Sequence, residues 1–265
     1  MFASQHVRIF HKYLYVTDKM TNHWALISSP VLVTIFSILY LYFILDWGPK
    51  YMKDKKPYSF KTFIFWYNIF QIIANSLIIQ QAIAAGWYSD GYMGCPEIDY
   101  SNDYNIYKMA STVWYLLYMK LIDYIETILY VLRKKNRQIS ALHVYHHVST
   151  MYFTWLAVKY YPNGHAMTVA VVNCGIHVIM YTYYLLASLG GNIQKLIEPF
   201  KPFLTLAQMI QFIALIMYAL QAFLPYCSAS RLGASLMIAD LAINFGMFFN
   251  FYMQNYMKKN KKSID

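Results

Sequence analysis

Residues 27–45 read ISSPVLVTIFSILYLYFIL, an apolar run without a charged side chain. A helix needs about 20 mostly apolar residues to cross the hydrocarbon layer of a bilayer, and this run has that length. The stretch therefore predicts a membrane-spanning helix, which sets the class of the whole chain.

Further helical segments of similar length follow along the chain. They lie roughly at 62–85, 111–132, 139–159, 166–189, 203–224 and 233–256. The segments at 111–132 and 139–159 contain charge and histidine, so hydropathy alone can miss them. The sequence predicts an all-α, polytopic membrane protein with seven transmembrane helices, folded as one domain over residues 1–265.

The overall composition agrees with a membrane protein. The chain is 58% hydrophobic and only 13% charged, whereas soluble domains carry about a quarter charged residues. The net charge of +10 comes from short basic clusters between the apolar runs, where orientation signals and anionic headgroups act. No nucleic-acid motif accompanies these clusters, so a nucleic-acid-binding protein is excluded.

The loops alternate in charge, which predicts their orientation. Loops 48–61 and 133–138 and the tail at 258–262 are strongly basic, whereas loop 86–107 has no lysine or arginine. The positive-inside rule then places residues 1–26 in the lumen and the basic tail at 257–265 in the cytosol. We expect no cleavable signal peptide, because charged residues interrupt the first 24 positions.

Two of the three cysteines fall on the predicted lumenal side. Cys95 and Cys227 lie in lumenal loops, whereas Cys174 lies within a helix. The lumen is oxidising, so a disulfide between Cys95 and Cys227 is a hypothesis, and two free thiols are the alternative.

The segment at 139–159 carries three histidines on one helix face. His143, His146 and His147 stand at positions i, i+3 and i+4. Polar groups at membrane depth usually face a protein interior or a wet cavity. The pattern indicates a catalytic site, and the alternative is a set of histidines that merely bond one helix to another.

The segment at 166–189 supplies a partner for this site. His177 shares a helical stripe with Asn173, Tyr181 and Tyr184, which can orient its imidazole. The segment at 203–224 adds the similarly spaced Gln208 and Gln211. Such amides commonly join helices, and contact with a substrate is the second interpretation.

The segment at 111–132 adds charged side chains at a spacing of three. Lys120, Asp123 and Glu126 descend one helix face, where opposite charges can pair. These residues either form a local ion pair or take part in function. In the second case one carboxylate orients a catalytic imidazole.

Several blocks of sequence carry a family resemblance that runs from about Trp24 to Tyr256. They are GPKYMKDKKP at 48–57, Tyr67-Asn68, KLIDYIET at 120–127, LRKKNRQISALHVYHH at 132–147, NCGIHVIMYTYY at 173–184, TLAQMIQ at 205–211 and FNFYMQNY at 249–256. In these blocks the chain resembles the very-long-chain fatty acid elongases, the condensing 3-oxoacyl-CoA synthases of the endoplasmic reticulum. The family usually has Glu before Asp in the lysine block, and this chain has the reverse order.

The resemblance implies condensation of a long-chain acyl-CoA with malonyl-CoA to give 3-oxoacyl-CoA, CO2 and CoA. It implies transmembrane helices around an acyl-chain tunnel, an endoplasmic-reticulum location, and no cofactor or metal. The implied catalytic residues are His143, His146, His147, His177 and Asn173. The implied substrate-binding residues are Lys120, Asp123, Glu126, Arg133, Lys134, Tyr181, Tyr184, Gln208 and Gln211.

The expected binding partners are acyl-CoA, malonyl-CoA and the bilayer. The elongation cycle also implies a ketoacyl reductase, a dehydratase and an enoyl reductase as partners. A homo-oligomer is left open. No nucleic acid is expected. An unperturbed imidazole, with a pKa of about 6.5, is largely neutral near neutral pH and can act as a nucleophile. We hypothesise that His146 or His177 accepts the acyl chain.

Two other functions fit parts of the pattern. Four histidines with Asp123 and Glu126 are plausible iron ligands of a desaturase or hydroxylase, although such enzymes generally show several histidine boxes. A seven-span receptor or transporter also uses buried charge, but no inverted repeat or broken helix supports it.

Overall fold

The computed structural model describes residues 21–87, 103–161, 164–227 and 229–257. All regular elements in these residues are helices, and no strand occurs among them. It forms two compact units, Met1–Ser59 with Gln81–Ala170 and Phe60–Gln80 with Val171–Asp265. The single domain expected from the sequence stays a prediction.

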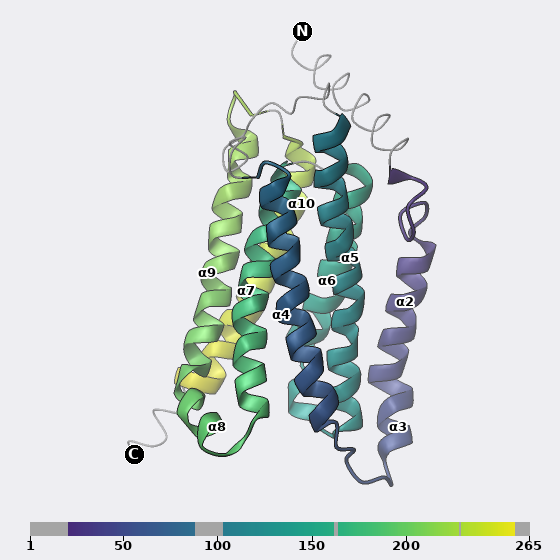
Figure 1. Ribbon diagram of the computed structural model, residues 1–265, viewed down its shortest axis with the longest axis vertical. Helices are drawn as coiled ribbons and strands as arrows, with labels where there is room; N and C mark the ends of the chain where they lie inside the picture. The colour runs from purple at the N-terminus through teal and green to yellow at the C-terminus, as the bar shows by residue number, and fades with distance from the viewer. Residues whose placement is uncertain (1–20, 88–102, 162–163, 228, 258–265) are drawn as a thin grey trace. The chain divides into compact units, whose positions relative to one another are not determined.

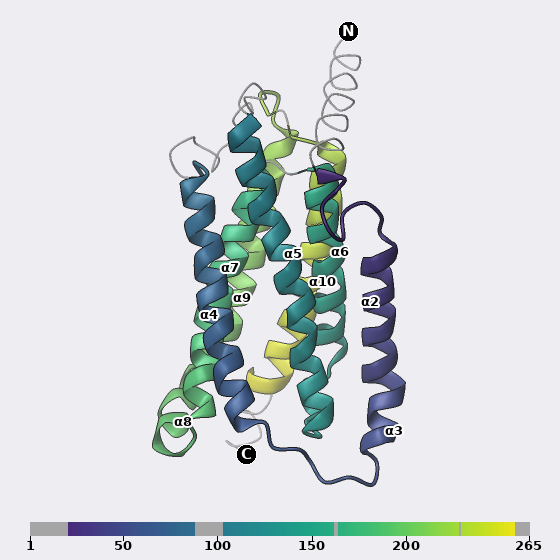
Figure 2. The same cartoon turned by 45° about the vertical axis from the view of Figure 1, so that its right-hand side comes forward.

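The first unit contains three long helical columns. They are α2 (Val31–Tyr42) continued by α3 (Gly48–Met52), α5 (Asp103–Leu132) and α6 (Ala141–Tyr160). Helices α5 and α6 lie side by side (Figures 1 and 2), and α2 packs against α6 and α3 against α5. Buried apolar side chains from all of these columns, among them Val33, Leu117 and Met151, form the core.

The first span begins and ends later than the sequence predicted. It starts at Val31, directly after Pro30, and runs through a π-helical turn at Phe43–Trp47 into α3. Residues 48–52, expected in a loop, are therefore helical. Pro49 lacks a backbone N–H to donate, and the π-helical turn directly before it, with its wider i→i+5 bonding, accommodates the proline within the continuous helix.

Gly48 is required at the start of α3. A Cβ at this position would lie 2.6 Å from the Phe43 carbonyl oxygen and 2.8 Å from Cγ1 of Val131 on α5. The absence of a side chain therefore allows α3 and α5 to approach closely.

The second unit is built from four long helices. They are α4 (Lys61–Ala84), α7 (Gly164–Ser188), α9 (Lys201–Leu220) and α10 (Arg231–Tyr252), the last continued by a π-helical turn at Met253–Met257. The last residues of α4, 81–84, and the first residues of α7, 164–170, belong to the first unit. The Phe212 and Phe248 rings, 5.2 Å apart, join α9 to α10. Gln208 on α9 contacts Met180 on α7, with 3.5 Å between Nε2 and Sδ.

The connection between α7 and α9 also differs from the prediction. Residues expected in loop 190–202 form the short helix α8 (Gly191–Ile197) and a 3₁₀ turn at Glu198–Phe200. Gly190 and Gly191 have positive φ values of 70° and 56°, which reverses the chain after α7. Figure 1 shows this reversal around α8.

Five stretches are long and apolar enough to cross a membrane by length and composition. They are Val31–Met52, Lys61–Ala84, Ala166–Ser188, Gly191–Phe223 and Arg231–Met257. Their outer faces expose large apolar side chains, such as Leu45 and Trp66, as a lipid-facing surface does. The chain is a multi-pass membrane protein. Helices α5 and α6, with 30 and 20 residues, are not among the five, so the predicted count of seven is not confirmed.

Candidate functional site

The histidine motif opens helix α6. Ser140 precedes the helix in an extended conformation, and its Oγ accepts the backbone N–H of His143 at 3.2 Å. This bond satisfies one of the donors left open at a helix start. The cap fixes where α6 begins, and with it the direction in which the histidines leave the helix.

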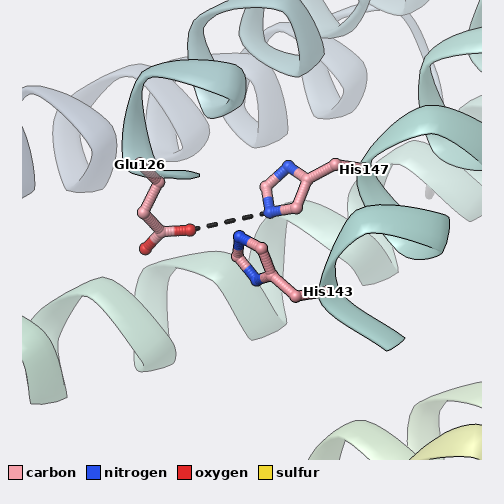
Figure 3. Close-up of side chains that lie close together, drawn as sticks. All are labelled: Glu126, His143 and His147. Carbon is pink, nitrogen blue, oxygen red and sulfur yellow. Dashed lines mark ion pairs between the residues drawn. The ribbon is translucent and has the colours of Figure 1, made fainter. Parts of the chain in front are cut away.

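Glu126 of α5 meets two of these histidines in the first unit (Figure 3). Its Oε2 lies 3.7 Å from Nε2 of His147. The rings of His143 and His147 are 4.2 Å apart between centroids. Glu126 and His147 are buried, so both lie away from bulk water. The contact across two helices fits the interpretation in which one carboxylate orients an imidazole.

The other carboxylate of α5 has a different neighbour. Asp123 lies beside Lys120, with 3.5 Å between Oδ2 and Nζ, and both side chains are almost fully buried. The i, i+3 pairing expected from the sequence is therefore present. The structure gives the two carboxylates separate contacts: Asp123 faces a lysine and Glu126 faces a histidine.

His143 is held from a second direction. Its Nε2 lies 2.8 Å from Oγ1 of Thr127, and that oxygen lies 2.9 Å from the hydroxyl of Tyr40 on α2. The ring of Tyr130 lies 5.4 Å from the His143 ring. His146, one position before His147, presents its ring edgewise at 5.7 Å from the His147 ring. The three histidines of the motif are thus close to one another.

The basic residues after α5 lie at the end of the same unit. Arg133 is half-buried, and the exposed Lys134 has a positive φ of 55° and donates from Nζ to the Lys53 carbonyl at 3.1 Å. The backbone N–H of Tyr58 donates to the Leu132 carbonyl at 3.1 Å. The basic loop after α3 therefore lies against the end of α5.

In the second unit, α7 positions the other expected site residues. His177 is buried, and its ring lies 5.7 Å from that of the fully buried Tyr181. Tyr184 lies 6.0 Å from Tyr181, and Asn173 is half-buried one turn before His177. The stripe on α7 is present as expected. The approach of His177 to the histidines of α6, which lie in the first unit, stays a prediction.

Helix α4 carries a polar ladder that the sequence reasoning missed. Asn75 Nδ2 donates to Oε1 of Gln71 at 3.2 Å, and Gln71 Nε2 donates to the Tyr67 hydroxyl at 2.8 Å. The Tyr67 ring in turn lies 6.0 Å from Tyr181 of α7. The sequence does carry a signal for this ladder, because Asn68, Gln71 and Asn75 stand three and four positions apart within an apolar helix.

Helices α9 and α10 hold the remaining polar residues of the second unit. Gln208 contacts Met180 of α7, which fits the interpretation that this amide joins helices, and Gln211 is buried. Asn244 on α10 donates to the Asp240 carbonyl at 2.9 Å. Within the described residues, Oδ1 of Asn244 has no hydrogen-bond partner.

Two of the three cysteines lie in the described residues. Cys174 is buried on α7 and is not part of a disulfide, and Cys227 is disulfide-bonded. Cys95 lies outside the described residues. Its pairing with Cys227 stays a prediction.

The cluster on α5 and α6 also has the donor set of a metal site. Ligand atoms of Glu126, His143 and His147 all lie within 4.8 Å of one another. However, Nε2 of His143 is hydrogen-bonded to Thr127, and Nε2 of His147 faces Glu126. A metal bound through Nε2 of His143 would have to displace the Thr127 contact, whereas the Glu126–His147 contact already joins two of the three donors.

The chain matches the model of the GNS1/SUR4 family (ELO) over residues 25–264. It belongs to this family. Among its relatives, very long chain fatty acid elongase 4 of Macaca mulatta is 36% identical over 248 residues, which cover 93% of this chain and 78% of the relative. The human elongase 4 is 35% identical over the same shares. Very long chain fatty acid elongase 1 of Mus musculus is 32% identical over 95% of this chain and 91% of its own length.

Proposed function

We propose that this chain catalyses the condensation of a long-chain acyl-CoA with malonyl-CoA, the first step of fatty acid elongation. Membership of the ELO family and relatives named fatty acid elongases support an enzyme that acts at the condensing step. The structural observation that carries the proposal is the buried contact of Glu126 with His147, beside His143 and His146. Such a group of imidazoles suits acyl transfer in a site of low water content.

The proposed reaction has two stages. An imidazole nitrogen of His146 or His177 attacks the thioester carbon of the acyl-CoA, the C–S bond breaks, and CoA leaves. Malonyl-CoA then loses CO2, and the electron pair of the broken C–C bond forms an enolate. The enolate carbon attacks the acyl carbon, the bond to the imidazole breaks, and 3-oxoacyl-CoA is released. Loss of CO2 supplies the carbon nucleophile, so no cofactor is required.

The remaining site residues have supporting roles in this scheme. Asn173 and the other histidines stabilise negative charge on the carbonyl or enolate oxygen. Lys120, Arg133 and Lys134 attract the phosphates of CoA. Tyr181, Tyr184, Gln208 and Gln211 contact the bound substrate, and Asp123 holds Lys120 in place through their ion pair.

We further propose that α5 and α6 cross the membrane, which gives seven spans around an acyl tunnel. Both helices have the required length, and their paired charges and clustered histidines lower the cost of burial. The basic loops then lie in the cytosol, with the amino terminus in the lumen of the endoplasmic reticulum. The other enzymes of the elongation cycle act on the product as partners.

The direct test is an assay of purified protein with malonyl-CoA and a panel of acyl-CoAs. We expect 3-oxoacyl-CoA, with release of CO2 in equal amount. His146→Ala and His177→Ala should each lower kcat by at least about 100-fold, because one removes the acyl acceptor and the other removes a group that stabilises negative charge on oxygen. His23→Ala is the matched control, since His23 is exposed and lies outside the histidine cluster. Product from the double variant His146→Ala/His177→Ala at the wild-type rate would exclude both residues as acyl acceptors.

The metal-ligand geometry of Glu126, His143 and His147 favours one second candidate, an iron-dependent desaturase or hydroxylase. The same preparation distinguishes the two functions. Condensation should continue without oxygen and after treatment with a chelator. Loss of product without oxygen, or loss after chelation that added iron reverses, would support the second candidate instead.

A further inference from the structure

A chain of hydrogen bonds leads from α2 through α5 to the first histidine of the motif. The Tyr40 hydroxyl lies 2.9 Å from Oγ1 of Thr127, and this oxygen lies 2.8 Å from Nε2 of His143. All three residues belong to the first unit. Tyr40 is 4% exposed and Thr127 is 0% exposed, so water does not compete for these bonds.

Which group donates in each of these hydrogen bonds follows from the protons that each group carries. A buried tyrosine hydroxyl that does not donate its proton is an unsatisfied donor, which buried polar groups rarely are. In the part of the chain that the structure describes, Thr127 is the only hydrogen-bond partner of Tyr40, so Tyr40 donates to Thr127. The Thr127 hydroxyl then donates its own proton to Nε2 of His143. An accepting Nε2 carries a lone pair, which leaves the imidazole proton on Nδ1.

We propose that Tyr40 and Thr127 are positioning residues that hold His143 in the tautomer protonated at Nδ1. Thr127 occupies the lone pair of Nε2, which withdraws this nitrogen from acyl transfer. The rings of Tyr130 and His147, at 5.4 Å and 4.2 Å, flank the imidazole. His143 then serves as an N–H donor, a group that can stabilise charge on a carbonyl or enolate oxygen. The expected effect on kinetics rests on the condensing function proposed above.

A neighbouring pair of residues provides a close control. Tyr124 of α5 stacks on Tyr40, with ring centroids 4.0 Å apart, and is also 4% exposed. Its hydroxyl lies 2.9 Å from Oγ of Ser37 on α2. This bond joins the same two helices as the bond of Tyr40, but it does not lead to a histidine. Tyr124→Phe therefore measures the general effect of removing a buried hydroxyl between α2 and α5.

The kinetic test compares conservative variants in the condensation assay. Tyr40→Phe and Thr127→Val should lower kcat about 10- to 100-fold with KM little changed. Each variant keeps the shape of the side chain but breaks the relay, the pair of hydrogen bonds from Tyr40 through Thr127 to His143. Thr127→Ser keeps the hydroxyl and should retain most of the wild-type kcat, as should Tyr124→Phe. A wild-type kcat in Thr127→Val would overturn the proposal. An equal loss in Tyr124→Phe would also overturn it, since the effect would then be loosened packing.

The tautomer itself can be measured without the reaction. We suggest ¹⁵N NMR of histidine-labelled protein, with the His143 signals assigned by their loss in His143→Ala. Wild type and Tyr124→Phe should show a protonated Nδ1 and an unprotonated Nε2, and Thr127→Val should lose this preference. A wild-type His143 protonated at Nε2 would refute the relay even in an active enzyme. Wild-type protein that shows the expected tautomer and forms no product would support the relay and contradict the condensing function.

Discussion

At the scale of single residues, the order of the two acidic side chains on α5 acquires a physical meaning. The sequence places Asp123 before Glu126 on this helix. The shorter Asp123 pairs with Lys120 on its own helix, whereas the longer Glu126 extends to His147 on α6. The extra methylene of glutamate suits the contact that crosses between helices.

The Lys120–Asp123 pair leads to a prediction about stability. Lys120→Met leaves the carboxylate of Asp123 without its buried cation, which should lower the free energy of unfolding by about 3 to 5 kcal/mol. The double variant Lys120→Met/Asp123→Leu removes both charges and should recover most of this loss. Chemical unfolding in detergent micelles measures both effects.

The exposed pair of Lys50 and Asp46 is the control, with side chains 74% and 45% exposed. Lys50→Met should change stability little, because this pair lies near the end of the first span and protein does not enclose either side chain. A double variant Lys120→Met/Asp123→Leu that is no more stable than Lys120→Met alone would contradict the prediction.

At the scale of elements, the start of α6 connects stability with activity. Ser140 caps α6 and Ser230 caps α10, each with its Oγ 3.2 Å from a backbone N–H three residues later. Replacing either serine by alanine should cost about 1 kcal/mol. Only Ser140→Ala should also lower kcat, because the bond it loses holds the backbone of His143.

Ser230→Ala is therefore the matched control for Ser140→Ala. Thermal unfolding and the condensation assay, measured on the same preparations, separate the two effects. Equal loss of kcat in both variants would show that the cap of α6 has no particular connection with the site.

At the scale of the whole molecule, the main prediction concerns the number of spans. If α5 and α6 both cross the membrane, the loop between them lies on the cytosolic side. If neither helix crosses, that loop lies on the side of loop 86–107. Asn136 is exposed in this loop, so a cysteine placed there reports its side directly.

We expect Asn136→Cys, in a chain with Cys174→Ser, to react with an impermeant maleimide in sealed microsomes whose cytosolic face is outward. A cysteine at Lys195, exposed on the short helix α8 between α7 and α9, should react equally and serves as the control. Labelling at 195 but not at 136 before detergent is added would favour five spans over seven.

Much of the candidate site was predictable because helical periodicity is a local property. The i, i+3, i+4 spacing placed His143, His146 and His147 on one face, and the structure brings their rings together. The Lys120–Asp123 pair followed from the same rule. The boundaries of the first span were less predictable, because Pro49 remains helical only through the π-helical turn that precedes it.

The sequence alone determined the all-helical membrane class and the polar residues that share each helix face, since both depend on the order of neighbouring side chains. Only the tertiary structure decided which carboxylate meets a histidine and which residue of α2 reaches His143 through Thr127. Tyr40 and Thr127 are 87 positions apart. A contact over that separation depends on how α2 and α5 pack, and no local pattern in either helix encodes it.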